Sequence, residues 1–304
     1  MIGAIIGDMV GAPFEFDTIK TKDFPFVNKR TGFTDDTVMT IAVAEALMKL
    51  DVDASVDEIH EEVTLSMLKW GSRYPYAGYG TMFSNWLDSD DPKPYESYGN
   101  GSAMRISSVG WLYPTLDRVR EVARAATEVT HNHPEGIKGA VATASAVYLA
   151  RVGVPKEDIR SYLEKEFGYD LSRTIDEIRP SYYHREDCQR SVPEALICFF
   201  DGRIMRMRSE MQYRLAVMRI RRRVSPVRWL RRIMAFLKKF KESLIGCQRI
   251  CWRLFQNLRR ERMGSDISGR NRRITSGIIK ASMHPCRNIQ RRRRTKIWCR
   301  FLML

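Results

Sequence analysis

The sequence predicts an all-α domain followed by a basic segment of a different kind. Apolar residues recur at three- and four-residue spacing in several segments, and the alternation typical of half-buried strands is nearly absent. The charge also changes sign along the chain. Residues 1–202 hold 21 Lys and Arg against 32 Asp and Glu, a net charge of −11, whereas residues 203–304 hold 30 basic and 4 acidic residues, a net charge of +26. We therefore expect a helical unit over 1–202 and a basic tail over 203–304.

Six helices are expected in the acidic unit, each from apolar residues at helical spacing. They cover residues 37–50, 56–70, 116–130, 135–152, 155–167 and 191–200. Thr37 is placed to cap the first helix, and Pro193 suits the first turn of the last. Acidic residues open the second helix, where the helix dipole favours them. The fourth is rich in alanine, which suits a helix packed closely against neighbours on several sides.

Several classes of protein do not fit the composition. The chain has no run of about 18 apolar residues, so we expect no membrane span. Its apolar start lacks the basic stretch of a secretory signal and carries Asp8. The acidic unit holds Cys188 and Cys198, and no paired CxxC zinc motif occurs. We expect reduced thiols and a cytoplasmic protein.

The sharpest motif is Thr34-Asp35-Asp36. Side chains at adjacent positions do not share a face of a helix, so paired carboxylates suit its interior badly. At a helix start both can turn toward one point and, with the threonine hydroxyl, offer the hard oxygen ligands that Mg²⁺ prefers. An ordinary acidic helix start is the alternative, because Asp and Thr are common there.

Four further motifs accompany this one. They are Gly7–Glu15 (GDMVGAPFE), Gly99–Arg105 (GNGSAMR), Thr130–Pro134 (THNHP) and Ser191–Leu196 (SVPEAL). Each is weak alone, but five motifs in this order over nearly 200 residues resemble the ADP-ribosylglycohydrolase family, which includes dinitrogenase-reductase-activating glycohydrolase. The resemblance implies a compact multi-helix bundle that hydrolyses the glycosidic bond of ADP-ribosyl groups on proteins or small compounds.

The resemblance also implies roles for particular residues. Two Mg²⁺ ions would lie between Thr34, Asp35 and Asp36 and a later Asp-x-Asp-Thr motif. Asp35, Asp36 and Glu15 would be the catalytic carboxylates, one of them acting as general acid or base beside a metal-oriented water. The substrate-binding residues would be Gly99, Asn100, Gly101, Ser102, Met104 and His131.

Each of these residues also has a plainer interpretation. Glu15 could be a surface acid after a proline turn, and the two glycines around Asn100 could form a tight turn that needs positive φ. His131, close to Pro134, could cap the alanine-rich helix. Asp8 is interpreted as mainly structural, as a support for the first helix.

The basic tail departs from the family pattern. Where the family has Gly-Gly-Asp-x-Asp-Thr, residues 216–221 read AVMRIR and contain no carboxylate. Permitted codons for these six residues, read in the frame set one base earlier, encode Gly-Gly-Asp-Ala-Asp-Thr. The same shift makes residues 205–215 and 230–237 resemble the family. Our hypothesis is a frameshift within a few codons of Gly202, which leaves at most a partial magnesium site and an impaired enzyme.

Two other functions remain open. The tail has the charge of a nucleic-acid-binding segment, and Trp229, Trp252 and Trp298 could stack on bases. It contains no known binding motif, so we expect at most nonspecific contact with nucleic acid. The other alternative is an inactive remnant of the enzyme.

Overall fold

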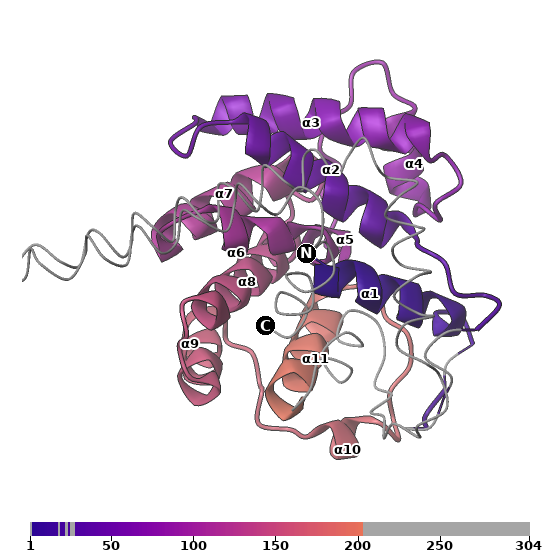
Figure 1. Cartoon of the computed structure of the whole chain (residues 1–304), viewed down its shortest axis with the longest axis vertical. Coiled ribbons are helices and arrows are strands. Elements are labelled where there is room, and N and C mark those ends of the chain that lie inside the picture. Colours follow the sequence, from indigo (N-terminus) through magenta and orange to yellow (C-terminus); the bar gives the residue numbers. More distant parts are fainter. Residues whose placement is uncertain (1, 18, 22–23, 25–27, 203–304) are drawn as a thin grey trace, which may run out of the picture. The chain divides into compact units, whose positions relative to one another are not determined.

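The computed structural model describes residues 2–17, 19–21, 24 and 28–202, and all regular elements among them are helices (Figure 1). One isolated antiparallel bridge joins Gly99 and Asp187. The all-α prediction is therefore confirmed for the described part of the chain. The expectations for the basic tail, including the frameshift and the 216–221 segment, lie outside the described residues.

The helices follow one another in a simple order, with η marking the 3₁₀ helices. They are α1 (Ile2–Gly11), η1 (Ala12–Phe14), α2 (Asp35–Lys49), α3 (Val56–Arg73), α4 (Thr81–Leu87), α5 (Gly101–Met104), η2 (Ile106–Ser108), α6 (Val109–Leu112), α7 (Leu116–Glu128), α8 (Pro134–Arg151), α9 (Lys156–Phe167), α10 (Ile175–Ile178) and α11 (Cys188–Asp201). All six predicted helices are present. The short helices α4, α5, α6 and α10 were not predicted, because so few residues hardly display a periodic pattern.

Two predicted helix starts are wrong. Helix α2 begins before Thr37, and its N-cap is Thr34, whose side chain accepts a hydrogen bond from the backbone of Asp36. Helix α11 also begins earlier, after the N-cap Asp187, so Pro193 lies inside the helix and not in its first turn. In both cases a side-chain oxygen upstream of the apolar stripe reaches the free amides of the first turn, and this contact sets the helix start.

Helix α8 lies at the centre of the bundle. Helices α5, α6, α7, α9 and α11 all pack against it (Figure 1). Ala140, Ala142 and Ala144 are fully buried, and small side chains allow such close approach. At the contact with α6, a Cβ added to Gly110 would lie 2.7 Å from the carbonyl oxygen of Ala144. The expectation that this alanine-rich helix packs on several sides is confirmed.

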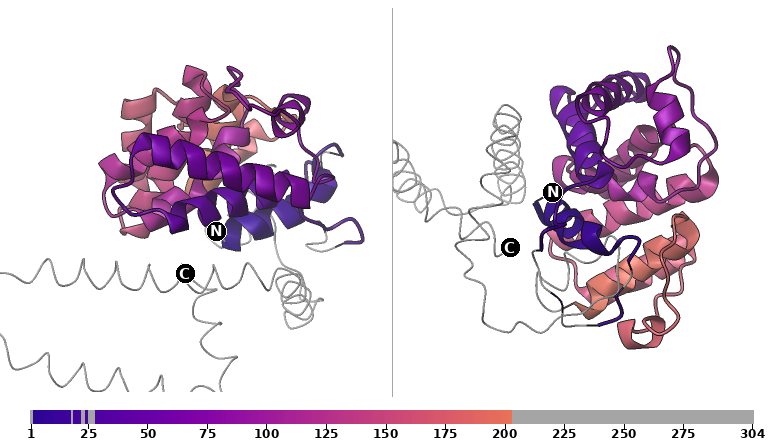
Figure 2. Two further views of the ribbon diagram at one scale, coloured as in Figure 1. Left: turned by 90° about the horizontal axis from the view of Figure 1, so that it is seen from above. Right: turned by 90° about the vertical axis from the view of Figure 1, so that its right-hand side faces the viewer.

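Two apolar clusters form the core, and α8 contributes to both. The larger one joins α2, α3, α4, α6 and α7 around large buried side chains such as Trp70 and Met39. The smaller one joins α9, α10 and α11 around Ile159, Leu163 and Ile197. Helices α2 and α3 run side by side in the larger cluster (Figure 2). This packing fixes the start of α2 relative to the loops that precede α5 and α8.

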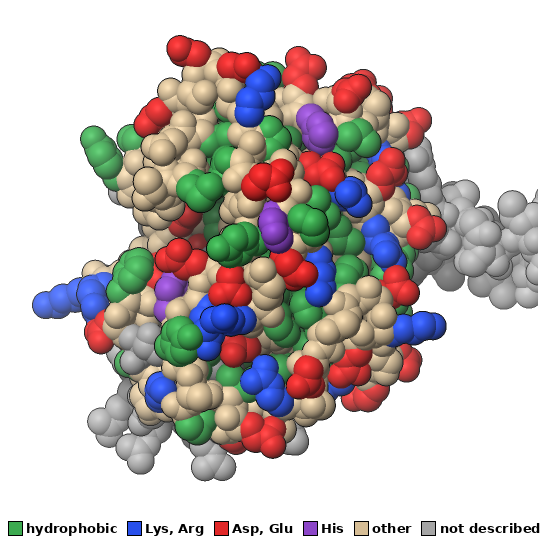
Figure 3. Space-filling model, turned by 180° about the vertical axis from the view of Figure 1, so that it is seen from behind, with side chains coloured by type: hydrophobic (Ala, Val, Ile, Leu, Met, Phe, Trp, Pro, Cys, Tyr) green, Lys and Arg blue, Asp and Glu red, His purple; other side chains and the backbone are tan. Residues whose placement is uncertain are grey.

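The described surface is polar and mixed in charge. Acidic and basic side chains are interspersed on the face shown in Figure 3. None of the described helices combines the length and the hydropathy that a membrane crossing requires. Cys188 and Cys198 are buried free thiols.

Candidate active site

The carboxylate of Asp8 ties α1 to the start of α2. It is 2% exposed. Its Oδ2 accepts hydrogen bonds from the backbone nitrogens of Thr34 at 2.8 Å and Thr37 at 3.2 Å, and from Thr37 Oγ1 at 2.5 Å. Its Oδ1 lies 2.7 Å from Thr34 Oγ1. Asp8 is structural, as expected. It lies on α1, and its carboxylate supports the start of α2.

The motif Thr34-Asp35-Asp36 forms the cap and first turn of α2. Thr34 Oγ1 accepts from the Asp36 nitrogen at 3.4 Å and lies 3.1 Å from Asp36 Oδ2. The Asp35 nitrogen donates to the Ala77 carbonyl at 2.8 Å. The local structure is thus the acidic helix start that was the plainer interpretation. This start leaves two carboxylates and a hydroxyl side by side at a positive helix end, as the metal interpretation also requires.

Like charges gather around Asp35. Burial, followed by the charges of Asp8 and Glu15, raises the pKa of Asp35 to about 7. Burial also raises the pKa of Asp8, although its four hydrogen bonds act in the opposite direction. Glu15 is half-buried at the end of η1. It is therefore close enough to Asp35 to act on its ionisation, and it is not an isolated surface acid.

The chemistry of this group fits a hard divalent cation in part. Thr34, Asp35, Asp36 and Glu15 offer only oxygen donors, which Mg²⁺ prefers, and a cation would relieve the repulsion that raises the pKa of Asp35. Within the described part of the chain, however, no three His, Cys, Asp or Glu side chains are arranged to hold a metal ion. The described residues therefore offer oxygen donors that suit a hard cation, without a complete set of ligands.

The loop before α5 is held in place by the segment that leads into α11. The nitrogen of Asn100 donates to the Glu186 carbonyl at 2.6 Å, and its Nδ2 donates to the Arg185 carbonyl at 3.2 Å. Cys188 Sγ lies 3.2 Å from both the Gly99 carbonyl and Ser102 Oγ. Cys188 was given no role from the sequence, since its partners are about 90 residues away in the chain.

Glycine is needed in this loop for space. Neither Gly99 nor Gly101 has positive φ, so the alternative interpretation, a tight turn that needs positive φ, is wrong. A Cβ added to Gly101 would lie 3.1 Å from His131 Nε2, and one added to Gly99 would lie 3.6 Å from it. The structure therefore brings His131 against the predicted substrate loop.

His131 is buried and does not cap α8. It is 5% exposed, and burial, followed by the charge of Arg105, holds its pKa well below the ordinary value. The cap is His133, whose side chain accepts a hydrogen bond from the Glu135 nitrogen at 3.1 Å. The alternative interpretation of His131 is wrong, because the second histidine of the THNHP motif takes the capping position.

Arg105 closes the Gly99–Arg105 motif, but no role was assigned to it from the sequence. It is 1% exposed, donates to Thr130 Oγ1, and places Nη2 3.4 Å from His131 Nδ1. Burial lowers its pKa to about 10, and Asp35 is among the groups that raise it. The sequence did hold a signal: Arg105 is a charged residue among small and mostly apolar ones in residues 99–110 (GNGSAMRISSVG).

Two contacts link the carboxylate group to the loop. Thr40 Oγ1 on α2 donates to the Met104 carbonyl at 3.2 Å, and Asp35 lies within electrostatic range of Arg105. The structure thus assembles in one region the carboxylates of α1 and α2, the Gly99–Met104 loop and His131. Two residues of the predicted set point into the interior, since Ser102 is buried against Cys188 and Met104 belongs to the larger apolar cluster.

The class of protein to which this helical chain belongs follows from comparison with known families. The sequence model of that family matches residues 1–205, and the chain belongs to the family. Curated relatives include mouse ADP-ribosylhydrolase ARH3, 30% identical over 202 residues, which covers 56% of this chain and 52% of the relative. The human protein of the same name is 30% identical over 186 residues, 50% of this chain and 49% of the relative. The chain spans about half the length of the curated relatives it matches.

A solved structure supports the fold. The chain is similar to one described as an ADP-ribosylglycohydrolase-related protein complex, with a TM-score of 0.51 and 24% sequence identity. The similarity covers 71% of this chain and 77% of the other. It agrees with the compact helical bundle that the family resemblance implied.

Proposed function

We propose that residues 1–202 form the substrate-binding side and one half of the metal site of a magnesium-dependent ADP-ribosyl hydrolase. The cluster of Asp8, Glu15 and Asp35 carries this proposal, since burial and the charges of Asp8 and Glu15 raise the pKa of Asp35 to about 7. Carboxylates that share a partly buried site repel one another, and their repulsion is relieved by a cation. Together with the family and with the adjacent Gly99–Met104 loop, they favour a site for a cation and an ADP-ribosyl group.

The proposed reaction is hydrolysis at the anomeric carbon of the ADP-ribosyl group. The oxygen of water bonds to that carbon, the N- or O-glycosidic bond to the acceptor breaks, and a proton from water passes to the leaving group. Thr34, Asp35 and Asp36 would hold Mg²⁺, which supplies a positive charge that orients the ribose hydroxyls and the water. Glu15 lies beside these ligands and is the proposed proton acceptor.

Residues on the loop would position the substrate. His131 lies against the glycines of the Gly99–Met104 loop, and the family resemblance makes this loop and His131 the proposed contacts of the ADP-ribosyl group. The substrates proposed are ADP-ribosylated proteins or small ADP-ribosyl compounds. The proposed compartment is the cytoplasm, in keeping with the free thiols of Cys188 and Cys198.

A magnesium titration of the full chain by calorimetry tests the metal site. We expect weak binding that Asp35→Asn and Asp36→Asn abolish, whereas Asp57→Asn, an exposed acid in the first turn of α3, leaves it unchanged. Release of ADP-ribose from an ADP-ribosylated protein is the matching activity assay. Binding that survives both site variants would contradict the proposal.

We further propose that the activity of this chain is impaired. The 216–221 segment contains no carboxylate, so Mg²⁺ would lack hard oxygen ligands from that side and bind less tightly. Determination of the nucleotide sequence across codons 198–240 tests the frameshift. The adjacent frame is expected to encode Gly-Gly-Asp-x-Asp-Thr, and restoring that frame is expected to raise activity. A coding sequence without that motif in any frame would end the hypothesis.

Contact of the basic tail with nucleic acid is proposed from its net charge of +26 alone. Such binding is expected to be nonspecific and to weaken steeply with salt. Measuring RNA binding at two salt concentrations, with and without residues 203–304, tests it. Sequence-selective binding would instead favour a nucleic-acid-binding function for the tail.

A further inference from the structure

Arg105 is buried without a carboxylate as a hydrogen-bond partner. Its partners among the described residues are Thr130 Oγ1 and His131 Nδ1, and its Nε is buried with no hydrogen bond. The guanidinium also lies over the Phe83 ring, 5.8 Å from its centroid. Burial of a cation is costly unless it is paired and hydrogen-bonded, so a buried arginine held by neutral groups is unusual. The position of Arg105 between the substrate loop and His131 suggests a role in the site.

The chemistry of the donors sets the proton position on His131. Arginine has N–H donors and no acceptor, so a guanidinium nitrogen 3.4 Å from Nδ1 requires an acceptor there. Thr130 Oγ1 accepts from Arg105, and its own hydrogen can go to Nδ1 at 2.7 Å or to the Thr127 carbonyl at 3.5 Å, of which Nδ1 is the closer acceptor. With Nδ1 as acceptor, the neutral ring must carry its proton on Nε2.

Nε2 is the atom that faces the predicted substrate loop. It makes no hydrogen bond with the described residues, and it lies 3.1 Å from the Cβ position of Gly101. An N–H at this position is a fixed donor at the edge of the loop, where the missing Cβ of Gly101 makes room for the ring. The natural partner is an acceptor oxygen of a ligand.

The surroundings keep the ring neutral. Burial and the positive charge of Arg105 both hold the pKa of His131 well below its ordinary value. The Tyr95 ring lies against His131, with ring centroids 5.8 Å apart. The charges of Tyr95, Asp35 and Cys188 raise the pKa of Arg105, against the lowering by burial. A neutral ring keeps a donor on Nε2 and an acceptor on Nδ1.

We propose that Arg105 is a positioning residue that holds His131 in its Nε2–H tautomer, so that the ring donates a hydrogen bond to an acceptor oxygen of the ADP-ribosyl group at the Gly99–Gly101 loop. The assignment of the tautomer depends on the contacts of Arg105 and Thr130. Only the identity of the ligand rests on the proposed function.

The test is a two-bond ¹H–¹⁵N correlation spectrum of the full chain labelled in histidine, because the pattern of cross-peaks identifies the tautomer. The chain has five histidines, and His131→Gln assigns the signal of His131 by its loss. We expect a neutral Nε2–H ring in the wild type throughout the neutral pH range. An Nδ1–H or doubly protonated ring would overturn the proposal.

Two substitutions at Arg105 separate positioning from packing. Arg105→Met removes the donors and the charge, so we expect a mixture of tautomers and a higher pKa for His131. Arg105→Lys keeps the charge and an N–H donor, so it is expected to retain the wild-type tautomer and also serves if the methionine variant fails to fold. Thr130→Val removes the alternative acceptor for Nδ1–H and is expected to keep the Nε2–H tautomer. An unchanged tautomer in Arg105→Met, or a lost one in Arg105→Lys, contradicts the proposal.

Titration with ADP-ribose by calorimetry then tests the ligand. Loss of one oriented hydrogen bond in Arg105→Met is expected to weaken binding about tenfold, with Arg105→Lys close to wild type. If the wild type has the Nε2–H tautomer but binds no ADP-ribose, the proposed function fails and the role of Arg105 stands. If ADP-ribose binds equally to wild type and Arg105→Met, the role of Arg105 in ligand binding fails and the proposed function stands.

Discussion

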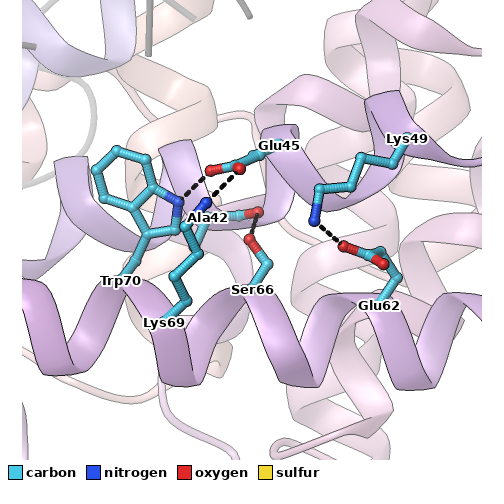
Figure 4. Close-up of polar contacts among 7 residues, drawn as sticks. All are labelled: Ala42, Glu45, Lys49, Glu62, Ser66, Lys69 and Trp70. Atoms are coloured by element: carbon cyan, nitrogen blue, oxygen red, sulfur yellow. Dashed lines mark hydrogen bonds and ion pairs between the residues drawn. The ribbon is translucent and has the colours of Figure 1, made fainter. Parts of the chain in front are cut away.

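Helix α2 carries two carboxylates in contrasting environments. Glu45, in the middle of the helix, accepts from Lys69 Nζ at 2.6 Å and from Trp70 Nε1 at 2.5 Å, both on α3 (Figure 4). These contacts outweigh burial and lower the pKa of Glu45. Asp35, at the start of the same helix, has other carboxylates as neighbours, and its pKa is raised to about 7. Glu45 has cationic and N–H partners within the fold, whereas burial and neighbouring carboxylates disfavour the charged form of Asp35, as the proposed cation site requires.

Removal of Asp8 is expected to have the largest effect. Asp8→Ala leaves the backbone nitrogens of Thr34 and Thr37 without their acceptor at the start of α2. We expect a loss of about 3 to 5 kcal/mol in the free energy of unfolding, measured by urea titration. Asp57→Asn, at an exposed helix start, should change it by less than about 0.5 kcal/mol. A loss for Asp8→Ala as small as that of the control would show that α2 is held in place without Asp8.

Neutralising Asp35 is expected to stabilise the metal-free protein. A carboxyl whose pKa is raised on folding stabilises the folded state at low pH. This stability is lost as the pH rises from the ordinary value of 3.8 through the folded value of about 7. Asp35→Asn should therefore raise the free energy of unfolding by about 2 to 3 kcal/mol near pH 8 and by little near pH 4. Urea titrations in chelator at both pH values measure this. Destabilisation at the higher pH would mean that Asp35 is a structural acid like Glu45.

Neutralising Glu45 is expected to lower the free energy of unfolding, the opposite of the Asp35 variant, and to have the smallest effect of the three. Glu45→Gln loses the ion pair with Lys69 and keeps an acceptor for Trp70, so we expect a loss of about 1 kcal/mol. Because the pKa of Glu45 is lowered on folding, this contribution is present at neutral pH and disappears as pH falls below the ordinary value of 4.5. Lys69→Met should give a similar loss, and the double variant should lose less than the sum. Additive losses would show that the pair does not interact.

Most of the fold could be predicted from residues close together in sequence. The six long helices follow from apolar spacing, and the close packing of α8 follows from its alanines. Helix starts were less predictable, because Thr34 and Thr37 both have the side chain of a cap. Thr37 is drawn instead into a hydrogen bond with Asp8, 29 positions earlier in the chain.

The candidate site, like the fold, could be predicted from the sequence only in part. The residue types of Thr34-Asp35-Asp36 and the Gly99–Met104 loop were enough to nominate them. The contact between Gly101 and His131, and the burial of Arg105 behind them, depend on how α5 and the start of α8 pack. No local pattern encodes a distance between residues that far apart in the chain.

By itself, therefore, the sequence determined the helical class, the order of the long helices and the motif of oxygen ligands at the start of α2. Those properties depend on side-chain type and short spacing, which the chain carries wherever it folds. Only the tertiary structure decided that Asp8 anchors that motif, that Glu15 and Asp35 repel one another, and that Arg105 faces His131. Charges act through space, so their pKa values and their partners depend on the packing of helices that are distant in sequence.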